Sequence, residues 1–386
     1  MTTPTAPSQS TLMRLLPQGD LQKGGSRVGW SFLRSFKECP MKWYNTYLRP
    51  HRRVPGAYGH TFPSRYNARE LGTLCHHVLQ LWYLSDCDIE PCSPTPADCT
   101  LPHAHGRCLK APHEHRGEYD LNAALASLPE FVVTHYPHWD NETCAEAIGD
   151  CTSLMERHVA YCGPGGTVPE FRTWQVAHDG ANIPLIERTF ELPLGYADYI
   201  FTSKADVVMQ GYGKLYPFDH KTHDAGVVSK KLRAYSVDGQ ITGQVWVLRA
   251  LWDTDPTTGL LKPPAEWLTG DGGCVNIIVK RAAASKPPRM LEIMGRTPLD
   301  LEMFRTSTVR TLKRMNELVE EWQGHVSAGM DPDAAALVTF DSFPSGDMCG
   351  EWPCDFYDGC KTREMLGDWL TDQTEPRWVP AQGATS

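Results

Sequence analysis

The stretch that decides the fold runs from Ser203 to Thr222 and reads SKADVVMQGYGKLYPFDHKT. It predicts a β-hairpin with strands over Ser203–Gln210 and Lys214–Lys221, joined by a turn over residues 211–213 that contains two glycines. Asp206 lies on the first strand, and Asp219 and Lys221 lie at the end of the second. Because successive side chains of a strand point to opposite faces, Asp219 and Lys221 share a face, about 7 Å apart along the strand.

The hairpin brings two carboxylates close to an amine. Carboxylates that converge in this way, here Asp206 and Asp219, form a hard oxygen site suited to Mg²⁺ or Mn²⁺. The ammonium group of Lys221 can orient an attacking water or stabilise negative charge that develops on a phosphate. An Asp-x-Lys tripeptide by itself is common and more often marks a solvated strand end with an ion pair, so this interpretation depends on the rest of the chain.

Helical and strand patterns surround the hairpin on both sides. Apolar spacing typical of helices occurs in five ranges, 68–84, 121–135, 142–161, 238–252 and 301–323. A further helix from Phe32 is broken at Cys39-Pro40. β-like stretches at 173–176 and 183–192 precede the hairpin, and a strand at 274–280 follows it. This order predicts an α/β fold with a central mixed sheet flanked by helices.

Composition sets the broad class. The 386 residues are 41% hydrophobic and 22% charged, which is ordinary for a globular protein with a full core. We expect one domain over 29–372, flexible tails over 1–28 and 373–386, and a Cys/His-rich insertion over 86–118. The net charge of −9 argues against coating of nucleic acid by bulk charge but leaves local basic grooves open. Without a run of about 18 apolar residues or a signal-peptide pattern, we expect a cytoplasmic protein with no membrane segment.

The chain has 13 cysteines and 15 histidines, although a reducing compartment disfavours disulfides. The densest group lies in the insertion, where a tetrahedral Zn²⁺ site can be formed by Cys99, His105, Cys108 and His115. Their spacing follows no finger pattern. The alternative is a polar, proline-rich loop whose histidines are solvated, and the sequence does not choose between the two.

Positive charge is local. The best candidate for contact with nucleic acid is the loop after the strand at 274–280, because it combines basic residues with proline and little competing acid. Its basic residues are Lys280, Arg281, Lys286 and Arg289. A solvated basic face is the alternative for any such cluster.

Six short motifs follow one another along the chain. They are Ser31-Phe-Leu-Arg-Ser-Phe36-Lys-Glu-Cys39-Pro40, Gly72 with His76, Glu187, Asp206, Asp219-His-Lys221 and Gln240. In order, spacing and residue type they resemble the RecB-type nucleases of the PD-(D/E)XK superfamily, which include CRISPR-adaptation nucleases and many phage exonucleases. The resemblance covers roughly residues 31 to 360. One departure is Gln244, which stands where the glutamine motif of the family has an aromatic residue.

The resemblance implies a restriction-endonuclease-like core and a metal-dependent DNA nuclease. An exonuclease acting on DNA ends or single strands, in recombination, repair or phage DNA metabolism, is expected ahead of an endonuclease. One or two Mg²⁺ or Mn²⁺ ions would be bound by His76, Asp206, Asp219 and the backbone carbonyl of His220. Lys221 would hold or activate the nucleophile, and Glu187 would hold a second metal or a water. Gln240 would reach a phosphate or a metal-bound water.

Three cysteines near the C-terminus, Cys349, Cys354 and Cys360, fall within a short stretch. In the resemblance, three such cysteines join one ahead of the nuclease core to hold a [4Fe–4S] cluster, and Cys39 fits that position. Four thiolates suit Zn²⁺ equally well by ligand type. The alternative is that Cys39 only precedes a helix stop and that the C-terminal cysteines are buried apolar residues.

A second class of function is a non-catalytic DNA-binding subunit of a repair or adaptation complex, stabilised by a metal cluster. The complete ligand set favours the nuclease. The expected partners are single-stranded DNA or duplex ends, together with recombination or repair proteins. The expected location is the cytoplasm of a bacterium or of a phage-infected host.

Overall fold

The computed structural model describes residues 28–48, 51–53, 66–85, 119–163, 166–167, 174–179, 183–197, 199–254, 268–280, 287–340 and 374–376. Outside these residues lie most of both tails, the 86–118 insertion with its zinc candidates, the three C-terminal cysteines, Arg281 and Lys286. The chain divides into two compact units. The sheet unit comprises residues 63–190 and 204–301, and the aromatic unit comprises residues 1–62, 191–203 and 302–386.

The sheet unit is built on one mixed β-sheet of six strands. Five follow the order β2-β5-β6-β8-β9, and the short β7 pairs with β6. The strands are β2 (Gln175–Val176), β5 (Val207–Gly211), β6 (Lys214–His223), β7 (Leu268–Thr269), β8 (Gly272–Val279) and β9 (Arg289–Gly295). β6 and β8 are parallel, whereas β5 and β9 are antiparallel to their neighbours. The predicted mixed α/β architecture is therefore confirmed.

β5 and β6 form the predicted hairpin. Gly211 pairs with Lys214, which leaves Tyr212 and Gly213 as the turn. Both have positive φ, 53° and 71°, as a type I′ turn requires. This turn matches the right-handed twist of the strands and sets the register that brings Asp206, just before β5, beside the end of β6.

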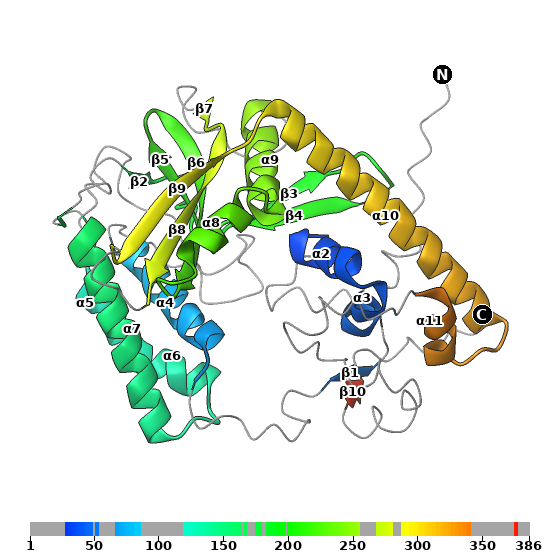
Figure 1. Cartoon of the computed structure of the whole chain (residues 1–386), viewed down its shortest axis with the longest axis horizontal. Coiled ribbons are helices and arrows are strands. Elements are labelled where there is room, and N and C mark those ends of the chain that lie inside the picture. The colour runs from blue at the N-terminus through cyan, green and yellow to red at the C-terminus, as the bar shows by residue number, and fades with distance from the viewer. Residues whose placement is uncertain are drawn as a thin grey trace. The chain divides into compact units, whose positions relative to one another are not determined.

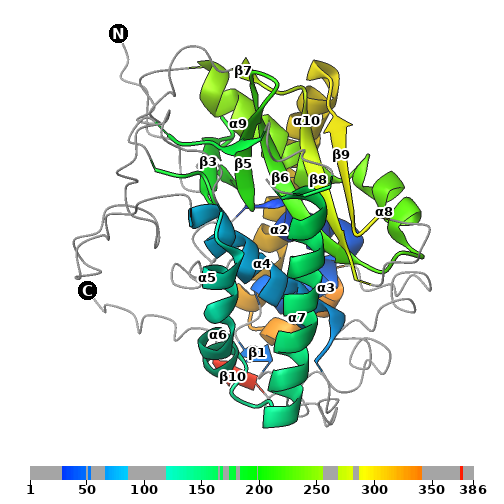
Figure 2. The same cartoon turned by 90° about the vertical axis from the view of Figure 1, so that its left-hand side faces the viewer.

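Helices cover both faces of the sheet (Figures 1 and 2). On one face lie α4 (Ala68–Leu84) and α7 (Asn141–Cys162), accompanied by α5 (Leu121–Ala126) and α6 (Leu128–His135). α9 (Gly239–Thr254) packs against β6 and β8 on the other face, and α8 (Val228–Tyr235) lies beside β8. Because side chains alternate along β6, His220 faces α4, whereas Asp219 faces α9.

The predicted helices over 68–84, 142–161 and 238–252 correspond closely to α4, α7 and α9. The predicted helix over 121–135 is instead two helices, α5 and α6, because Pro129 in the first turn of α6 starts a new helix there. α8 and β9 have no counterpart in the sequence analysis, which treats residues 280–289 as a loop. No helix in the part of the chain that the structure describes is long and apolar enough to span a bilayer.

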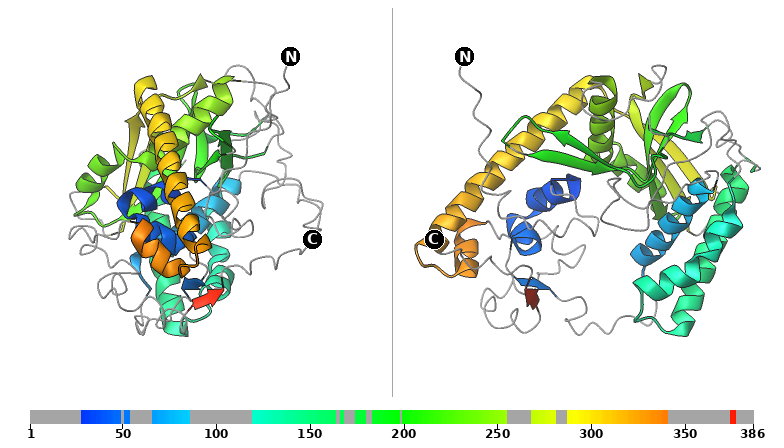
Figure 3. Two further views of the ribbon diagram at one scale, coloured as in Figure 1. Left: turned by 90° about the vertical axis from the view of Figure 1, so that its right-hand side faces the viewer. Right: turned by 180° about the vertical axis from the view of Figure 1, so that it is seen from behind.

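The aromatic unit contains α2 (Trp30–Glu38), α3 (Pro40–Tyr47), most of α10 (Pro298–Ser327) and α11 (Pro332–Thr339) (Figure 3). Two short pairs of strands accompany them, β1 (His51–Arg53) with β10 (Thr374–Pro376) and β3 (Thr189–Pro193) with β4 (Ile200–Lys204). The core is aromatic, since Trp43 packs edge-on against Phe32 and Phe36. Cys39 caps α3, so the predicted break at Cys39-Pro40 is confirmed.

Candidate active site

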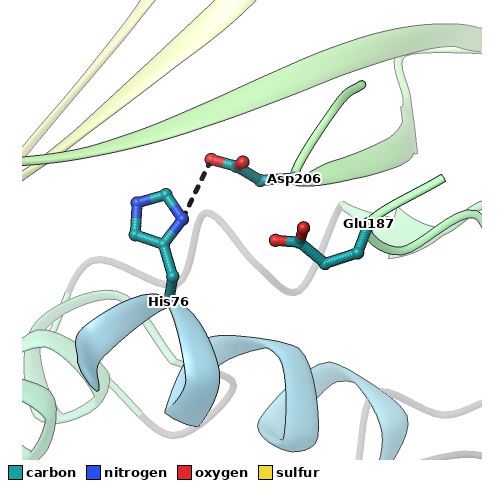
Figure 4. A group of neighbouring side chains, drawn as sticks. All are labelled: His76, Glu187 and Asp206. Carbon is teal, nitrogen blue, oxygen red and sulfur yellow. Dashed lines mark ion pairs between the residues drawn. The ribbon is translucent and has the colours of Figure 1, made fainter. Parts of the chain in front are cut away.

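Three side chains of the sheet unit converge on one point. His76 on α4, Glu187 and Asp206 each bring a ligand atom within 4.8 Å of the other two (Figure 4). His76 Nδ1 lies 3.6 Å from Asp206 Oδ2. One imidazole and two carboxylates at this spacing can hold a divalent cation.

The approach of α4 to β6 depends on Gly72. α4 begins with a capping box formed by Asn67 and Glu70, and Gly72 lies one turn before His76. A Cβ atom at Gly72 would meet Thr222 Oγ1, just after Lys221, at 3.1 Å. The glycine therefore permits the close approach of α4 to β6.

His76 is oriented by the backbone of β6. Its Nε2 lies 2.9 Å from the carbonyl oxygen of His220. Since a carbonyl only accepts, Nε2 carries a hydrogen and donates it, and Nδ1 points towards Asp206. This bond is the outer-shell contact that fixes the tautomer of a metal-binding histidine. In this structure the His220 carbonyl thus acts on His76, whereas the sequence analysis expects it to bind a metal directly.

Glu187 lies in a bend and not in a strand, which corrects the sequence analysis. Its φ is 52°, in the left-handed region that side chains other than glycine rarely adopt. Its backbone N–H donates to the carbonyl of Asp206 at 2.8 Å, and its carboxylate pairs with Lys204. The unusual backbone turns Glu187 into the site, and left-handed residues of this kind cluster at functional centres.

The two carboxylates of the group are crowded. Burial raises the pKa of Asp206; His76 lowers this pKa, and Asp219 raises it further. Burial also raises the pKa of Glu187, and Asp206 adds to that effect while Lys204 opposes it. The site therefore carries more buried negative charge than its own cations neutralise, and a divalent cation would relieve that excess.

Asp219 and Lys221 form a second pair beside the first group. Lys221 Nζ lies 2.7 Å from Asp219 Oδ2, so the two side chains share a face as predicted. Burial lowers the pKa of Lys221, but Asp219 and Asp206 outweigh it and raise that pKa above its ordinary value. The amine is therefore held as a cation. Gln240 Nε2 donates to Asp219 Oδ1 at 2.8 Å, so both carboxylate oxygens of Asp219 have partners.

Gln244 supports the site from α9. Its Nε2 donates to the backbone carbonyl of Lys204 at 3.0 Å, and Lys204 is the partner of Glu187. Gln240 and Gln244 thus hold protein groups of the site, whereas the sequence analysis assigns such amides to a phosphate or a metal-bound water.

A buried polar chain lies behind the site, on the α4 side of the sheet. Arg289 Nε donates to Asn276 Oδ1 at 2.6 Å, and Asn276 Nδ2 donates to His220 Nδ1 at 2.7 Å. His220 Nε2 then donates to the hydroxyl of Tyr83 at 3.3 Å. The backbone N–H of His220 donates to Asp206 Oδ2 at 2.6 Å. The chain therefore anchors the residue between Asp219 and Lys221.

One expectation for a DNA-binding residue changes with these contacts. Arg289 is only 3% exposed and is engaged with Asn276, so the expectation that it contacts DNA is wrong. The sequence places Arg289 in a basic loop because no sequence signal shows that β9 starts at this residue. Lys280 lies directly after β8, and its contact with DNA stays a prediction.

Three further residues contribute to the site without having been predicted from the sequence: Lys204, Tyr83 and Asn276. Lys204 lies two residues before Asp206, a spacing that places both on one side of an extended chain and could have identified it. Tyr83 lies seven residues after His76 on α4, a spacing that places both on one side of the helix and could have identified it. Asn276 carries no local signal, because it reaches His220 only through the pairing of β6 with β8.

The mixed sheet with its flanking helices and the group of His76, Glu187 and Asp206 are consistent with a nuclease fold. Residues 28–360 match the PD-(D/E)XK nuclease superfamily, and the chain belongs to that superfamily. Members typically use Mg²⁺ or Mn²⁺, in agreement with the donor set of His76, Glu187 and Asp206. A comparison with curated proteins finds no match.

Proposed function

We propose that this protein is an Mg²⁺- or Mn²⁺-dependent deoxyribonuclease that acts as an exonuclease on DNA ends or single strands. The observation that carries the proposal is the convergence of His76, Glu187 and Asp206 within 4.8 Å. The adjacent Asp219–Lys221 pair supports it. The resemblance to phage and RecB-type exonucleases supports the preference for ends and a role in recombination, repair or phage DNA metabolism.

The residues of the chain divide the work of phosphodiester hydrolysis. His76, Glu187 and Asp206 would hold the divalent cation, with Asp219 beside them. When bound, such an ion neutralises phosphate charge and makes water more acidic. Lys221, kept cationic by Asp219 and Asp206, would orient the nucleophile or stabilise charge on the phosphate. Gln240 keeps Asp219 in place for that task.

Direct cleavage assays test the proposal. The protein is incubated with end-labelled single-stranded, blunt duplex and closed circular DNA, with Mg²⁺, with Mn²⁺ or with a chelator. We expect metal-dependent degradation of linear DNA, survival of circles and complete loss of activity with the chelator. Lys221→Met should lower the rate about 10²- to 10³-fold. Lys214→Met, at a half-exposed position on the same strand, is the matched control. Cleavage of circles would replace the exonuclease by an endonuclease, and wild-type rates for Lys221→Met would refute the mechanism.

A non-catalytic DNA-binding subunit is the alternative function, and the same assay separates the two. DNA binding without cleavage in every metal would favour that alternative. For both functions we propose recombination or repair proteins as partners. The proposed location is the cytoplasm of a bacterium or of an infected host.

The cysteine ligands extend the proposal to further metals. Cys39 caps α3, where its Sγ accepts from Lys42 N at 3.4 Å, and it would join Cys349, Cys354 and Cys360 around a [4Fe–4S] cluster. A Zn²⁺ ion would bind Cys99, His105, Cys108 and His115. Iron, sulfide and zinc analysis after anaerobic purification tests both sites. Zinc without iron would redirect the cysteine cluster to zinc, and absence of both metals would remove the two sites.

A further inference from the structure

Beyond the Asp219–Lys221 pair, the ends of β6 and β8 lie side by side. The strands are parallel, and His223 at the end of β6 pairs with Val279 at the end of β8. Lys280 N donates to the carbonyl of His223 at 2.9 Å. Lys221 is therefore only two residues away from His223, the residue beside which Lys280 leaves the sheet.

Three lysines gather around His223. Burial lowers the pKa of His223, and the charges of Lys231, Lys280 and Lys221 add to this effect in that order, so that the pKa is about 4. Lys231 lies on α8, which packs beside β8 (Figure 2). Three separate elements thus direct positive charge at one place. We call Lys221, Lys231 and Lys280 the lysine cluster.

Neighbouring groups engage part of the lysine cluster. Lys280 Nζ donates to the neutral carbonyl oxygen of Ala68 at 3.3 Å. Asp219 pairs with Lys221. Near His223 the opposing carboxylate is the exposed Asp224. Lys231 forms no ion pair with any residue that the structure describes, and α8 adds the exposed Lys230 and Arg233. A region of this kind attracts anions along a surface next to the catalytic lysine.

An aromatic side chain completes the surface. Tyr235 at the end of α8 hydrogen-bonds through its hydroxyl to His223 Nε2 at 2.7 Å, and the two rings stack with centroids 5.9 Å apart. The same tyrosine lies near enough to Lys221 to affect its pKa. Tyr235 therefore ties α8 to the strand end that carries the catalytic lysine.

We propose that the lysine cluster is a track for the nucleic-acid substrate, on which Lys231 and Lys280 bind backbone phosphates near the scissile one. The inference rests on the proposed nuclease function and names the surface that holds its substrate. Phosphate binding by lysine is independent of base sequence, so the track suits an enzyme that degrades a strand progressively.

Binding measurements without cleavage test the track. A short fluorescent single-stranded deoxyoligonucleotide is titrated with protein in chelator over a range of salt concentrations. The variants are Lys231→Gln, Lys280→Gln and the double substitution. Lys214→Gln is the matched control, because Lys214 is also half-exposed and lies roughly 20 Å from Lys221 along β6. Each cluster substitution should weaken binding roughly threefold or more and lower the salt slope by about one.

The possible outcomes separate the track from the nuclease. An unchanged affinity and salt slope for the double variant, with the wild type cleaving DNA, overturns the track and leaves the nuclease. Weaker binding by the double variant, with no cleavage by the wild type in any metal, supports the track and overturns the nuclease. An equal loss of DNA affinity for Lys214→Gln would show that the effect depends on the total charge of the protein and not on the lysine cluster. This result would also overturn the track. If Lys280→Gln unfolds, Lys231→Glu on exposed α8 provides the same test and should weaken binding more than Lys231→Gln.

Discussion

His76 Nε2 and the carbonyl oxygen of His220 lie 2.9 Å apart, and this contact joins α4 to β6. The N–H of the same residue, His220, donates to Asp206 Oδ2 at 2.6 Å. Two of the three candidate metal ligands are therefore oriented by the backbone of one residue. Because that residue lies between Asp219 and Lys221, the Asp-x-Lys segment supplies its own side chains and also positions His76 and Asp206.

Replacement of His76 tests the metal site. His76→Gln should weaken Mn²⁺ binding by at least the roughly 10- to 100-fold that loss of a supporting residue costs, and Mg²⁺ binding by less, because imidazole favours Mn²⁺. Calorimetric titration of each metal measures the change. His77→Gln is the control, since the His77 ring stacks on Phe131 and bonds Ser127. Equal Mn²⁺ affinity in both variants would remove His76 from the site.

Replacement of Gly72 tests the close approach of α4 to β6. Alanine in a helix is favoured over glycine by about 0.5–1 kcal/mol. Gly149→Ala on α7, where a Cβ meets nothing within 4 Å, should realise that gain. Gly72→Ala should gain less and cleave DNA more slowly, because its Cβ pushes on Thr222 Oγ1 at 3.1 Å. Chemical denaturation and initial rates measure both effects. An equal gain in stability with full activity would show that the contact is unimportant.

Replacement of Arg289 separates structure from DNA binding. Arg289→Met leaves the fully buried Asn276 without its donor, which should destabilise the fold by about 1–3 kcal/mol. The salt dependence of DNA binding should stay that of the wild type. Urea denaturation and DNA titration check the two parts. A lower salt slope with unchanged stability would restore Arg289 as a phosphate ligand.

Acid should destabilise the fold through His158 on α7. Burial, with a smaller contribution from the charge of Arg289, lowers its pKa from 6.5 to about 3. Its folded pKa is thus below the unfolded value, so only the unfolded chain gains the proton as pH falls below 6.5. The free energy of unfolding then drops by up to about 1.4 kcal/mol per pH unit from this group, and above that range the group has no effect.

The variant His158→Gln should flatten this dependence by about one proton in urea titrations at a series of pH values. The exposed His135→Gln on α6 should leave it unchanged. A wild-type slope in His158→Gln would assign the acid sensitivity to other groups.

Much of the sheet unit could be predicted from the sequence because its signals are local. The hairpin around Gly213, the capped helix that carries His76, and the shared face of Asp219 and Lys221 depend on turn chemistry and on the periods of helix and strand. The order of the motifs identified the superfamily for the same reason. α8 and β9 escaped prediction because they are short and their charged residues resemble a loop.

The sequence by itself determined the class of protein and the residue types of its site. Only the tertiary structure decided that Glu187 enters the metal group from a left-handed bend, that Arg289 is buried behind His220, and that Lys231 and Lys280 both lie close enough to His223 to lower its pKa. Local periodicity indicates which face of a strand or helix a side chain occupies, and it therefore predicts that Asp219 and Lys221 share a face. Convergence of residues from separate elements depends on the pairing of β6 with β8 and on the packing of α4 and α8, which are long-range contacts that no local pattern encodes.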